Sequence, residues 1–291
     1  MKNPNAKTIV TPKRDFKARL FEMIFSDKKE LLSLYNAVNG THYTNPEDLE
    51  LNTLENAIYL SMRNDISFVI GSKVSLYEQQ STYSLNLPLR YLFYIADLYS
   101  VMTCNENLYG SKLIKIPAPR FIIFYNGEME KPEHEMMRLS DAFSIKESSP
   151  MLELKAEFIN INPGYNQELL DACKVLKDYS LYTARVREYA KGMEVRDAVE
   201  MAVTECISEG ILAEFLIKNR AEAIKMSIYE YDEERQRQWD REEGRETGRE
   251  EGEARYARLV ERLLAERKLD ELKRTTEDKT YLRMLYEEYN L

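Results

Sequence analysis

A predicted β-hairpin across residues 65–80 is the feature that most constrains the fold. Two segments rich in β-branched and aromatic residues flank Gly71-Ser72. Glycine at the first of two connecting positions is typical of a type II′ hairpin turn. Counting outward from this turn places Asp65 opposite Glu78, and directly opposed residues have β-carbons about 4.5 to 5.5 Å apart on one face. The hairpin therefore predicts two neighbouring carboxylates.

Two carboxylates at that separation repel unless a cation lies between them. Mg²⁺ is typically held by one or two carboxylates together with waters and substrate phosphates. Gln80 shares the face of Glu78 and could orient a water or a phosphate oxygen, while Val74 and Leu76 on the same face indicate a buried end of the strand. The alternative is a half-exposed hairpin whose acids are ordinary surface residues, with Asp65 capping the start of its strand.

The rest of the pattern predicts an α/β protein. A capping-box spacing from Asp27 to Glu30 precedes a helix that ends at Asn39-Gly40. Helices are also predicted over 16–24 and from Asn86, and strands over 120–125 and 152–161. From Asn166 onward the pattern is helical throughout. The predicted apolar face of the helix from Asn86 consists of Leu89, Leu92, Phe93, Ala96 and Tyr99.

Charge and composition narrow the classes of function. The formal net charge of −9 argues against a surface that coats nucleic acid uniformly, so contact with DNA must be local. Residues 1–20 form a basic arm with six lysines and arginines against one acid, and the arm is either a phosphate contact or a solvated leader. The phosphate-binding candidates in the arm are Lys13, Arg14, Lys17 and Arg19.

Few residues in this chain suit zinc or triad chemistry. Three widely spaced cysteines and two histidines fit neither a disulfide framework nor a zinc site. Chemistry, if present, must use carboxylates. The sequence has no apolar stretch of signal-peptide or membrane-span length, so we expect a cytoplasmic protein without a membrane partner.

Several motifs together resemble the recombination-promoting nuclease and putative transposase family of the PD-(D/E)XK nuclease superfamily. They are Asn64-Asp65, Glu78-Gln79-Gln80, Asn86-Leu87-Pro88-Leu89-Arg90, Ile116-Pro117-Ala118-Pro119, Phe124-Tyr125-Asn126-Gly127, Leu139-Ser140-Asp141-Ala142, Asp171-Ala172-Cys173, Glu209-Gly210-Ile211-Leu212 and the Glu/Gly-rich tail. The resemblance covers nearly the whole chain. It implies an α/β, restriction-endonuclease-like core with a mixed central sheet flanked by helices, followed by a C-terminal helical region. It also implies Mg²⁺-dependent endonuclease activity on DNA, linked to recombination or mobile elements.

The resemblance assigns catalytic positions to Asp65, Glu78 and Gln80. Asn64-Asp65 matches the PD pair, Glu78 matches the (D/E), and Gln80 stands where the superfamily has lysine. Asp65 and Glu78 are then the implied ligands of Mg²⁺, for which Mn²⁺ can substitute. Glutamine supplies only neutral hydrogen bonds, so a cation from elsewhere would have to replace the lysine.

Two further residues are accessory candidates. Arg90, or Lys17 and Arg19 in the basic arm, could supply the cation, although Arg90 could equally form an ion pair on the helix surface. An upstream helical glutamate often completes sites in this superfamily, and Glu22 is the nearest such residue. The alternative for Glu22 is a charge that faces solvent.

The tail carries glycines at every fourth position, Gly244, Gly248 and Gly252, ahead of a leucine-bearing helix. Such a stripe allows two helices to pack closely and predicts a homo-oligomer that forms through the C-terminal helices. The leucines that follow could continue this contact as a short coiled coil. A charged flexible linker is the alternative. We divide the chain into a basic arm (1–20), a nuclease-like domain (15–190) and a helical region (191–291).

Two functions of different class follow from these observations. The first is a metal-dependent DNA endonuclease. The second is a catalytically silent member that binds nucleic acid or assembles through its tail, having lost the lysine. Carboxylate and metal chemistry does not itself distinguish DNA from RNA.

Overall fold

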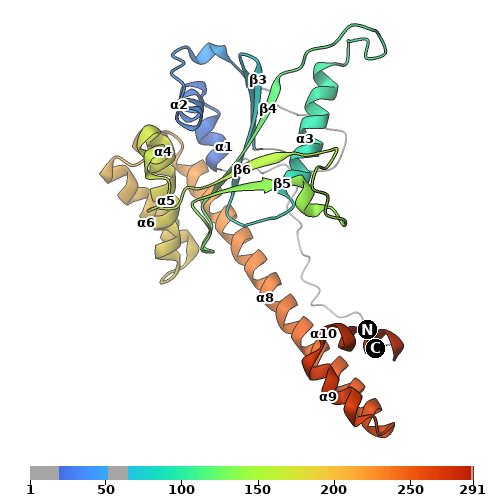
Figure 1. Cartoon of the computed structure of the whole chain (residues 1–291). Helices are drawn as coiled ribbons and strands as arrows, with labels where there is room; N and C mark the ends of the chain where they lie inside the picture. Colours follow the sequence, from blue (N-terminus) through green and yellow to red (C-terminus); the bar gives the residue numbers. More distant parts are fainter. Residues whose placement is uncertain (1–19, 52–64, 290) are drawn as a thin grey trace, which may run out of the picture. The chain divides into compact units, whose positions relative to one another are not determined.

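A six-stranded mixed sheet forms the centre of the protein. The computed structural model describes residues 20–51, 65–289 and 291. The strands are β1 (Leu49–Leu51), β2 (Ile66–Ile70), β3 (Lys73–Gln80), β4 (Ala118–Tyr125), β5 (His134–Arg138) and β6 (Lys155–Asn160), in the order β1-β2-β3-β4-β6-β5. The pairs β3–β4 and β4–β6 are parallel, and the other neighbours are antiparallel. With helices on both faces (Figure 1), the predicted α/β class and mixed sheet are confirmed.

The helices take up the rest of the chain. They are α1 (Leu20–Phe25), α2 (Lys28–Asn39), α3 (Leu87–Met102), α4 (Gln167–Ala172), α5 (Lys174–Ala190), α6 (Val195–Glu209), α7 (Ala213–Lys218), α8 (Arg220–Ala265), α9 (Leu269–Glu277) and α10 (Lys279–Glu288). Short 3-10 turns lie at η1 (Pro46–Asp48) and η2 (Leu139–Ala142). Asp27 caps α2 by accepting from the backbone amides of Lys29 and Glu30, and Gly40 ends it in the left-handed conformation, as predicted.

The β2–β3 hairpin has the predicted register. Ile70 pairs with Lys73, and Ile66 pairs with Tyr77. Gly71 has φ of 58°, which the first position of a type II′ turn requires and which costs glycine no steric strain. The two-residue connection therefore fixes which side chains of β3 face each side of the sheet.

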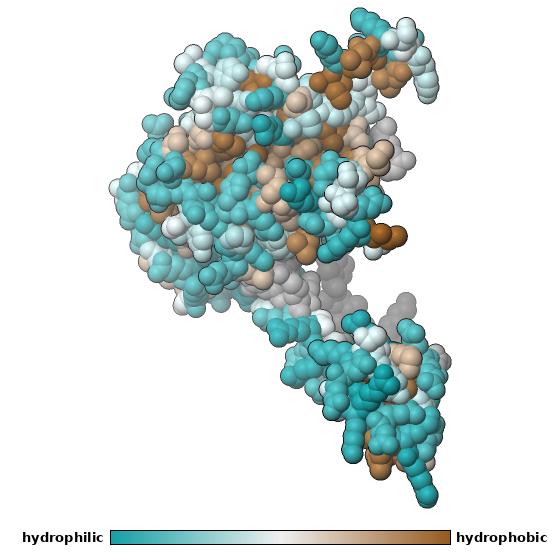
Figure 2. Space-filling model, viewed as in Figure 1, coloured by the Kyte–Doolittle hydropathy of each residue, from teal (hydrophilic) through white to brown (hydrophobic). Residues whose placement is uncertain are grey.

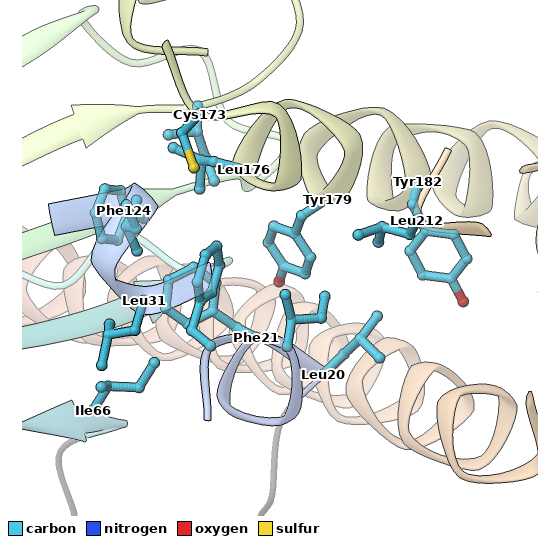
Figure 3. Close-up of a cluster of buried hydrophobic side chains, with 14 of the residues drawn as sticks. Leu20, Phe21, Leu31, Ile66, Phe124, Cys173, Leu176, Tyr179, Tyr182 and Leu212 are labelled. Atoms are coloured by element: carbon cyan, nitrogen blue, oxygen red, sulfur yellow. The ribbon is translucent and has the colours of Figure 1, made fainter. Parts of the chain in front are cut away.

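One face of the sheet carries the larger hydrophobic core. Figure 3 shows Phe21 of α1, Phe124 of β4 and Tyr179 of α5 converging there. The ring centroids of Phe21 and Phe124 are 5.6 Å apart, and those of Phe21 and Tyr179 are 5.5 Å apart, the latter edge to face. Side chains of α6 and α7, among them Val199 and Leu216, belong to the same core.

Helix α3 covers the other face, but not with the predicted residues. Its buried side chains are Leu87, Pro88, Tyr91, Tyr94, Ile95 and Leu98. Leu89 and Phe93, which we expected inside, are 38% and 51% exposed. The helix has apolar residues on nearly every side, so its periodicity does not decide which face is buried. The bond from the Tyr91 hydroxyl to the backbone oxygen of Ile122 favours the observed face.

The strands after α3 differ in part from the prediction. β4 extends the predicted segment to Ala118, whereas β6 is shorter than the predicted 152–161. β5 was not predicted, since its sequence lacks apolar alternation; it forms by antiparallel pairing with β6. Figure 2 shows apolar side chains on the segment between α3 and β4, where Leu108, Leu113 and Ile116 are exposed.

The chain forms two compact units, Met1–Tyr231 and Asp232–Leu291, and α8 passes from the first into the second. In the second unit, Leu259 and Leu263 of α8 pack with Leu285 of α10. The segment with the glycine stripe is helical. Apart from the backbone of α8 itself, no atom of the described residues lies within 4 Å of a Cβ built at Gly244, Gly248 or Gly252. Oligomerisation through this stripe stays a prediction.

In the part of the chain that the structure describes, no helix is long and apolar enough to cross a membrane. Cys173 and Cys206 are buried and Cys104 is exposed, and none of the three forms a disulfide.

Among the glycines, Gly127, just after β4, leaves the least space for a side chain. A Cβ at this position would lie 1.9 Å from the backbone oxygen of Ser81, so the backbone would have to move. We therefore expect Gly127→Ala to lower the free energy of unfolding by about 2 to 4 kcal/mol, measured by denaturant unfolding. In Gly192→Ala, the matched control, the nearest atom to the new methyl group is 3.9 Å away. Equal losses in the two variants would contradict this packing.

Candidate active site

The candidate site lies at the carboxyl end of β3. Glu78 is fully buried, and Gln80 is almost so. Their side chains share a face, because alternate residues of a strand point the same way, and Gln80 Nε2 donates to Glu78 Oε1 at 2.8 Å. Val74 and Leu76 on that face belong to the core beneath α3. The predicted change from apolar to polar along this face of β3 is therefore observed.

Asp65 lies at the same end of the hairpin. It immediately precedes β2, is half-buried, and accepts a hydrogen bond from the backbone N–H of Gln79 at 2.7 Å. Continuing the observed register from Ile66 and Tyr77 places Asp65 opposite Glu78. The side chain thus closes the open end of the hairpin, as the capping alternative proposed, while remaining beside the second carboxylate.

Arg90 forms an ion pair with Glu78. Its Nη2 group contacts Glu78 Oε1, and its Nε and Nη2 groups donate to the Tyr94 hydroxyl at 3.2 and 3.1 Å. The Glu78 side chain is 1% exposed and that of Arg90 is 28% exposed. Burial lowers the pKa of Arg90, but Glu78, Tyr94 and Asp65 outweigh it and raise the pKa above its ordinary value. Arg90 therefore pairs with a buried site residue, not with a partner on the helix surface.

The nearby acids also affect the pKa values of Tyr91 and Tyr94, two buried tyrosines of α3. Burial, followed by the negative charges of Glu78 and Asp65, raises the pKa of Tyr91. The pKa of Tyr94 is raised in the same way, mainly by burial and then by Glu78, against the opposing effect of Arg90. Both phenols therefore stay protonated and neutral. Tyr91 donates to the backbone oxygen of Ile122 at 2.8 Å.

A carboxamide cluster, Gln79 and Asn126 with Tyr179 and Thr183, lies on the opposite face of the sheet. Gln79 Nε2 donates to Asn126 Oδ1 at 2.6 Å, and Asn126 Nδ2 donates to Thr183 Oγ1 at 3.3 Å and Tyr179 OH at 3.5 Å. No site role was predicted for Asn126. Its position directly after a buried parallel strand is the signal that could have identified it, since polar groups gather at the carboxyl ends of such strands.

A second polar cluster lies just beyond the carboxyl end of β3 and was not predicted from the sequence. Tyr83, three residues beyond Gln80, donates to Glu135 at 3.0 Å, and Lys131 Nζ lies 3.6 Å from the centroid of the Tyr83 ring. Burial and then the bond to Glu135 raise the pKa of Tyr83 to about 12. Lys131 is thus a second cation, besides Arg90, among the described polar residues near the end of β3.

The donor set at Asp65 and Glu78 suits Mg²⁺ in its chemistry. Within residues 20–51, 65–289 and 291, no group of three or more His, Cys, Asp or Glu side chains is placed to hold a metal ion. Two carboxylates are nevertheless enough for Mg²⁺, which keeps waters and takes phosphate oxygens as its other ligands. Glu78 Oε1 already accepts from Gln80 and Arg90, so a divalent ion would compete with Arg90 for the same carboxylate.

The remaining site predictions have different outcomes. Glu22 is half-buried on α1, which packs against the opposite sheet face from Glu78. Its accessory role stays a prediction. Asn64, Lys13, Arg14, Lys17 and Arg19 lie outside the described residues.

A separate groove of about 800 Å³ lies between α3 and the amino-terminal half of β4. Its lining includes Leu92, Tyr99 and Phe121 with Lys73 at the first position of β3. The candidate site is at the other end of that strand, so the groove and the acids are distinct features.

Comparisons with protein-family models, curated proteins and solved structures found no match to this chain. The functional argument therefore depends on the geometry of the site and on the motif resemblance.

The ion pair between Glu78 and Arg90 can be tested by stability without added metal. Arg90→Met leaves a buried carboxylate uncompensated, and we expect it to lower the free energy of unfolding by about 2 to 3 kcal/mol. Adding Glu78→Gln removes the charge and should recover part of that loss, with a coupling of about 2 kcal/mol in the double-mutant cycle. Denaturant unfolding in a chelator measures all four proteins.

The control for this cycle is Arg185→Met. Arg185 pairs with Glu209, whose side chain is 50% exposed. We expect Arg185→Met to lower the free energy of unfolding by less than about 1 kcal/mol. Additive losses at positions 78 and 90 would show that the two side chains do not interact.

Proposed function

We propose that this protein is a metal-dependent endonuclease that hydrolyses phosphodiester bonds in DNA, linked to recombination or mobile elements. The observation that carries the proposal is the convergence of Asp65 and Glu78 at the polar end of a buried hairpin, with Gln80 and Arg90 on the second acid. Two acids at this spacing match the acidic positions of the PD-(D/E)XK pattern that the chain resembles, and Gln80 stands where that pattern has lysine.

Each side chain has a definable role in this proposal. Asp65 and Glu78 would hold Mg²⁺ or Mn²⁺, which when bound lowers the pKa of a coordinated water and stabilises charge on the phosphate. Gln80 donates to Glu78 and thereby orients that carboxylate without adding charge. Arg90 supplies the positive charge that lysine supplies elsewhere in the superfamily.

A second candidate is a catalytically silent protein that binds nucleic acid or assembles with itself. The observation that favours it is the contact of Arg90 with Glu78, which already neutralises the acid that would otherwise attract a divalent ion. The presence of Gln80 at the lysine position favours it as well.

The partner proposals follow from charge and exposure. DNA is the proposed partner of the basic arm and of the acid site, and the net charge of −9 confines the contact to local cations. A second copy of the chain is the proposed partner of the glycine stripe on α8, whose three glycines are exposed among the described residues. The proposed location is the cytoplasm.

Cleavage of plasmid DNA tests the enzyme proposal. We expect the wild-type protein to nick or linearise plasmid with Mg²⁺ or Mn²⁺ and to lose this activity in a chelator. Asp65→Asn and Glu78→Gln should each reduce the rate by a factor on the order of 100 or more, because each removes a metal ligand. Glu50→Gln, at an exposed position of β1, is the matched control and should keep full activity.

Equal cleavage by wild type, Asp65→Asn and Glu78→Gln would remove these acids from the active site. Inactivity of the wild type across Mg²⁺ and Mn²⁺ concentrations, with DNA binding retained, would favour the silent alternative. Matched DNA and RNA substrates decide which nucleic acid is cut.

A further inference from the structure

The Glu78 carboxylate and the Arg90 guanidinium occupy very different environments although they touch. Glu78 is enclosed by the sheet and α3, whereas more than a quarter of the Arg90 side chain reaches solvent. A carboxylate at such a position needs a positive partner, and Arg90 contacts it. The guanidinium therefore lies at the boundary between the buried acid and the approach from solvent.

Tyr94 holds Arg90 in this position. One turn farther along α3, its hydroxyl accepts from both Nε and Nη2 of Arg90. Among the described residues, Arg90 uses its Nε and Nη2 groups to bond to Tyr94 and Glu78. Its Nη1 group therefore stays available to donate to another acceptor. A guanidinium with donors on two edges can contact a carboxylate on one side and a phosphate oxygen on the other.

A divalent ion on Glu78 would lie beside the Arg90 guanidinium. Asp65 and Glu78 carry two negative charges, and Arg90 contacts Glu78. A divalent ion on both carboxylates would repel the adjacent guanidinium. Because Arg90 is partly exposed, it can move outward, where a nucleic-acid phosphate would become its new partner.

We propose that Arg90 is an exchangeable counter-ion, which pairs with Glu78 in the metal-free protein and turns to a backbone phosphate of DNA when a divalent cation takes Glu78. This inference rests on the proposed function and adds a phosphate-contacting residue that replaces the missing lysine. In this proposal Arg90 competes with the metal for Glu78. After the metal displaces it, Arg90 contacts the substrate.

Titration of the full-length protein with Mn²⁺ alone, followed by the electron paramagnetic resonance of free Mn²⁺, tests the exchange. Arg90→Met removes the competing charge and should tighten Mn²⁺ binding about tenfold. Tyr94→Phe keeps the ring but removes the hydroxyl that holds Arg90, and should tighten binding about threefold. Because Tyr94→Phe is a mild change, it remains informative if Arg90→Met folds poorly.

Two matched variants serve as controls. Arg185→Met makes the same change of charge at a distant ion pair, and Tyr91→Phe removes a neighbouring hydroxyl that donates to Ile122. Neither should change Mn²⁺ affinity, whereas Asp65→Asn should weaken it. Unchanged or weaker Mn²⁺ binding in both Arg90→Met and Tyr94→Phe would overturn the exchange.

Binding of a DNA duplex in Ca²⁺ or in a chelator tests the second half of the proposal. Arg90→Met should weaken DNA binding about tenfold in Ca²⁺, where Arg90 faces the phosphate, and by less than about twofold in the chelator, where Arg90 remains on Glu78. The same loss in both conditions, or no loss in Ca²⁺, would overturn it.

These measurements separate the exchange from the proposed function. If no protein binds Mn²⁺, wild type included, both the metal site and the exchange are wrong. If the wild type binds Mn²⁺ and cuts DNA but neither Arg90→Met nor Tyr94→Phe binds Mn²⁺ more tightly, the nuclease proposal stands and the exchange alone fails.

Discussion

The contact between Glu78 and Arg90 is the interaction on which the candidate site depends. A carboxylate with no solvent exposure at the end of a central strand is unfavourable unless a charged partner accompanies it. That partner comes from α3, so the helix must place its first turns over the carboxyl end of β3. Leu87 and Tyr91 achieve this by packing into the core beneath the helix. The polar site and the apolar core are therefore built by the same helix.

The period of two along β3 separates two polar systems. Glu78 and Gln80 face α3, while Gln79 between them faces α5 and bonds to Asn126. The ionic chemistry is thus confined to one face of the sheet, and neutral amides and hydroxyls occupy the other. Asp65 connects the two systems, since its carboxylate accepts from the backbone of Gln79 while its charge acts on Arg90. A shift of register by one residue would exchange these faces and bury Glu78 among the aromatic side chains beneath α1.

Local chemistry explains what the sequence could predict. Gly71-Ser72 sets the hairpin register within a few residues, and Asp27 with Gly40 sets the ends of α2, so these features were predicted correctly. The buried face of α3 was not, because its apolar residues surround the helix and only contacts with distant residues, such as the bond of Tyr91 to the backbone oxygen of Ile122, select a side. The Arg90 contact could not be decided for the same reason. β5 depends on pairing with β6, which its own sequence does not encode.

The identity of residue 80 becomes understandable beside Arg90. Glu78 Oε1 receives both the Gln80 amide and the Arg90 guanidinium. A lysine at position 80 would bring a second full positive charge to the same buried oxygen, and the two cations would repel each other at contact distance. A neutral amide keeps the orienting hydrogen bond and leaves a single cation on the acid. With glutamine at position 80 and arginine at position 90, the buried acid therefore receives its positive charge from the helix and a neutral hydrogen bond from the strand.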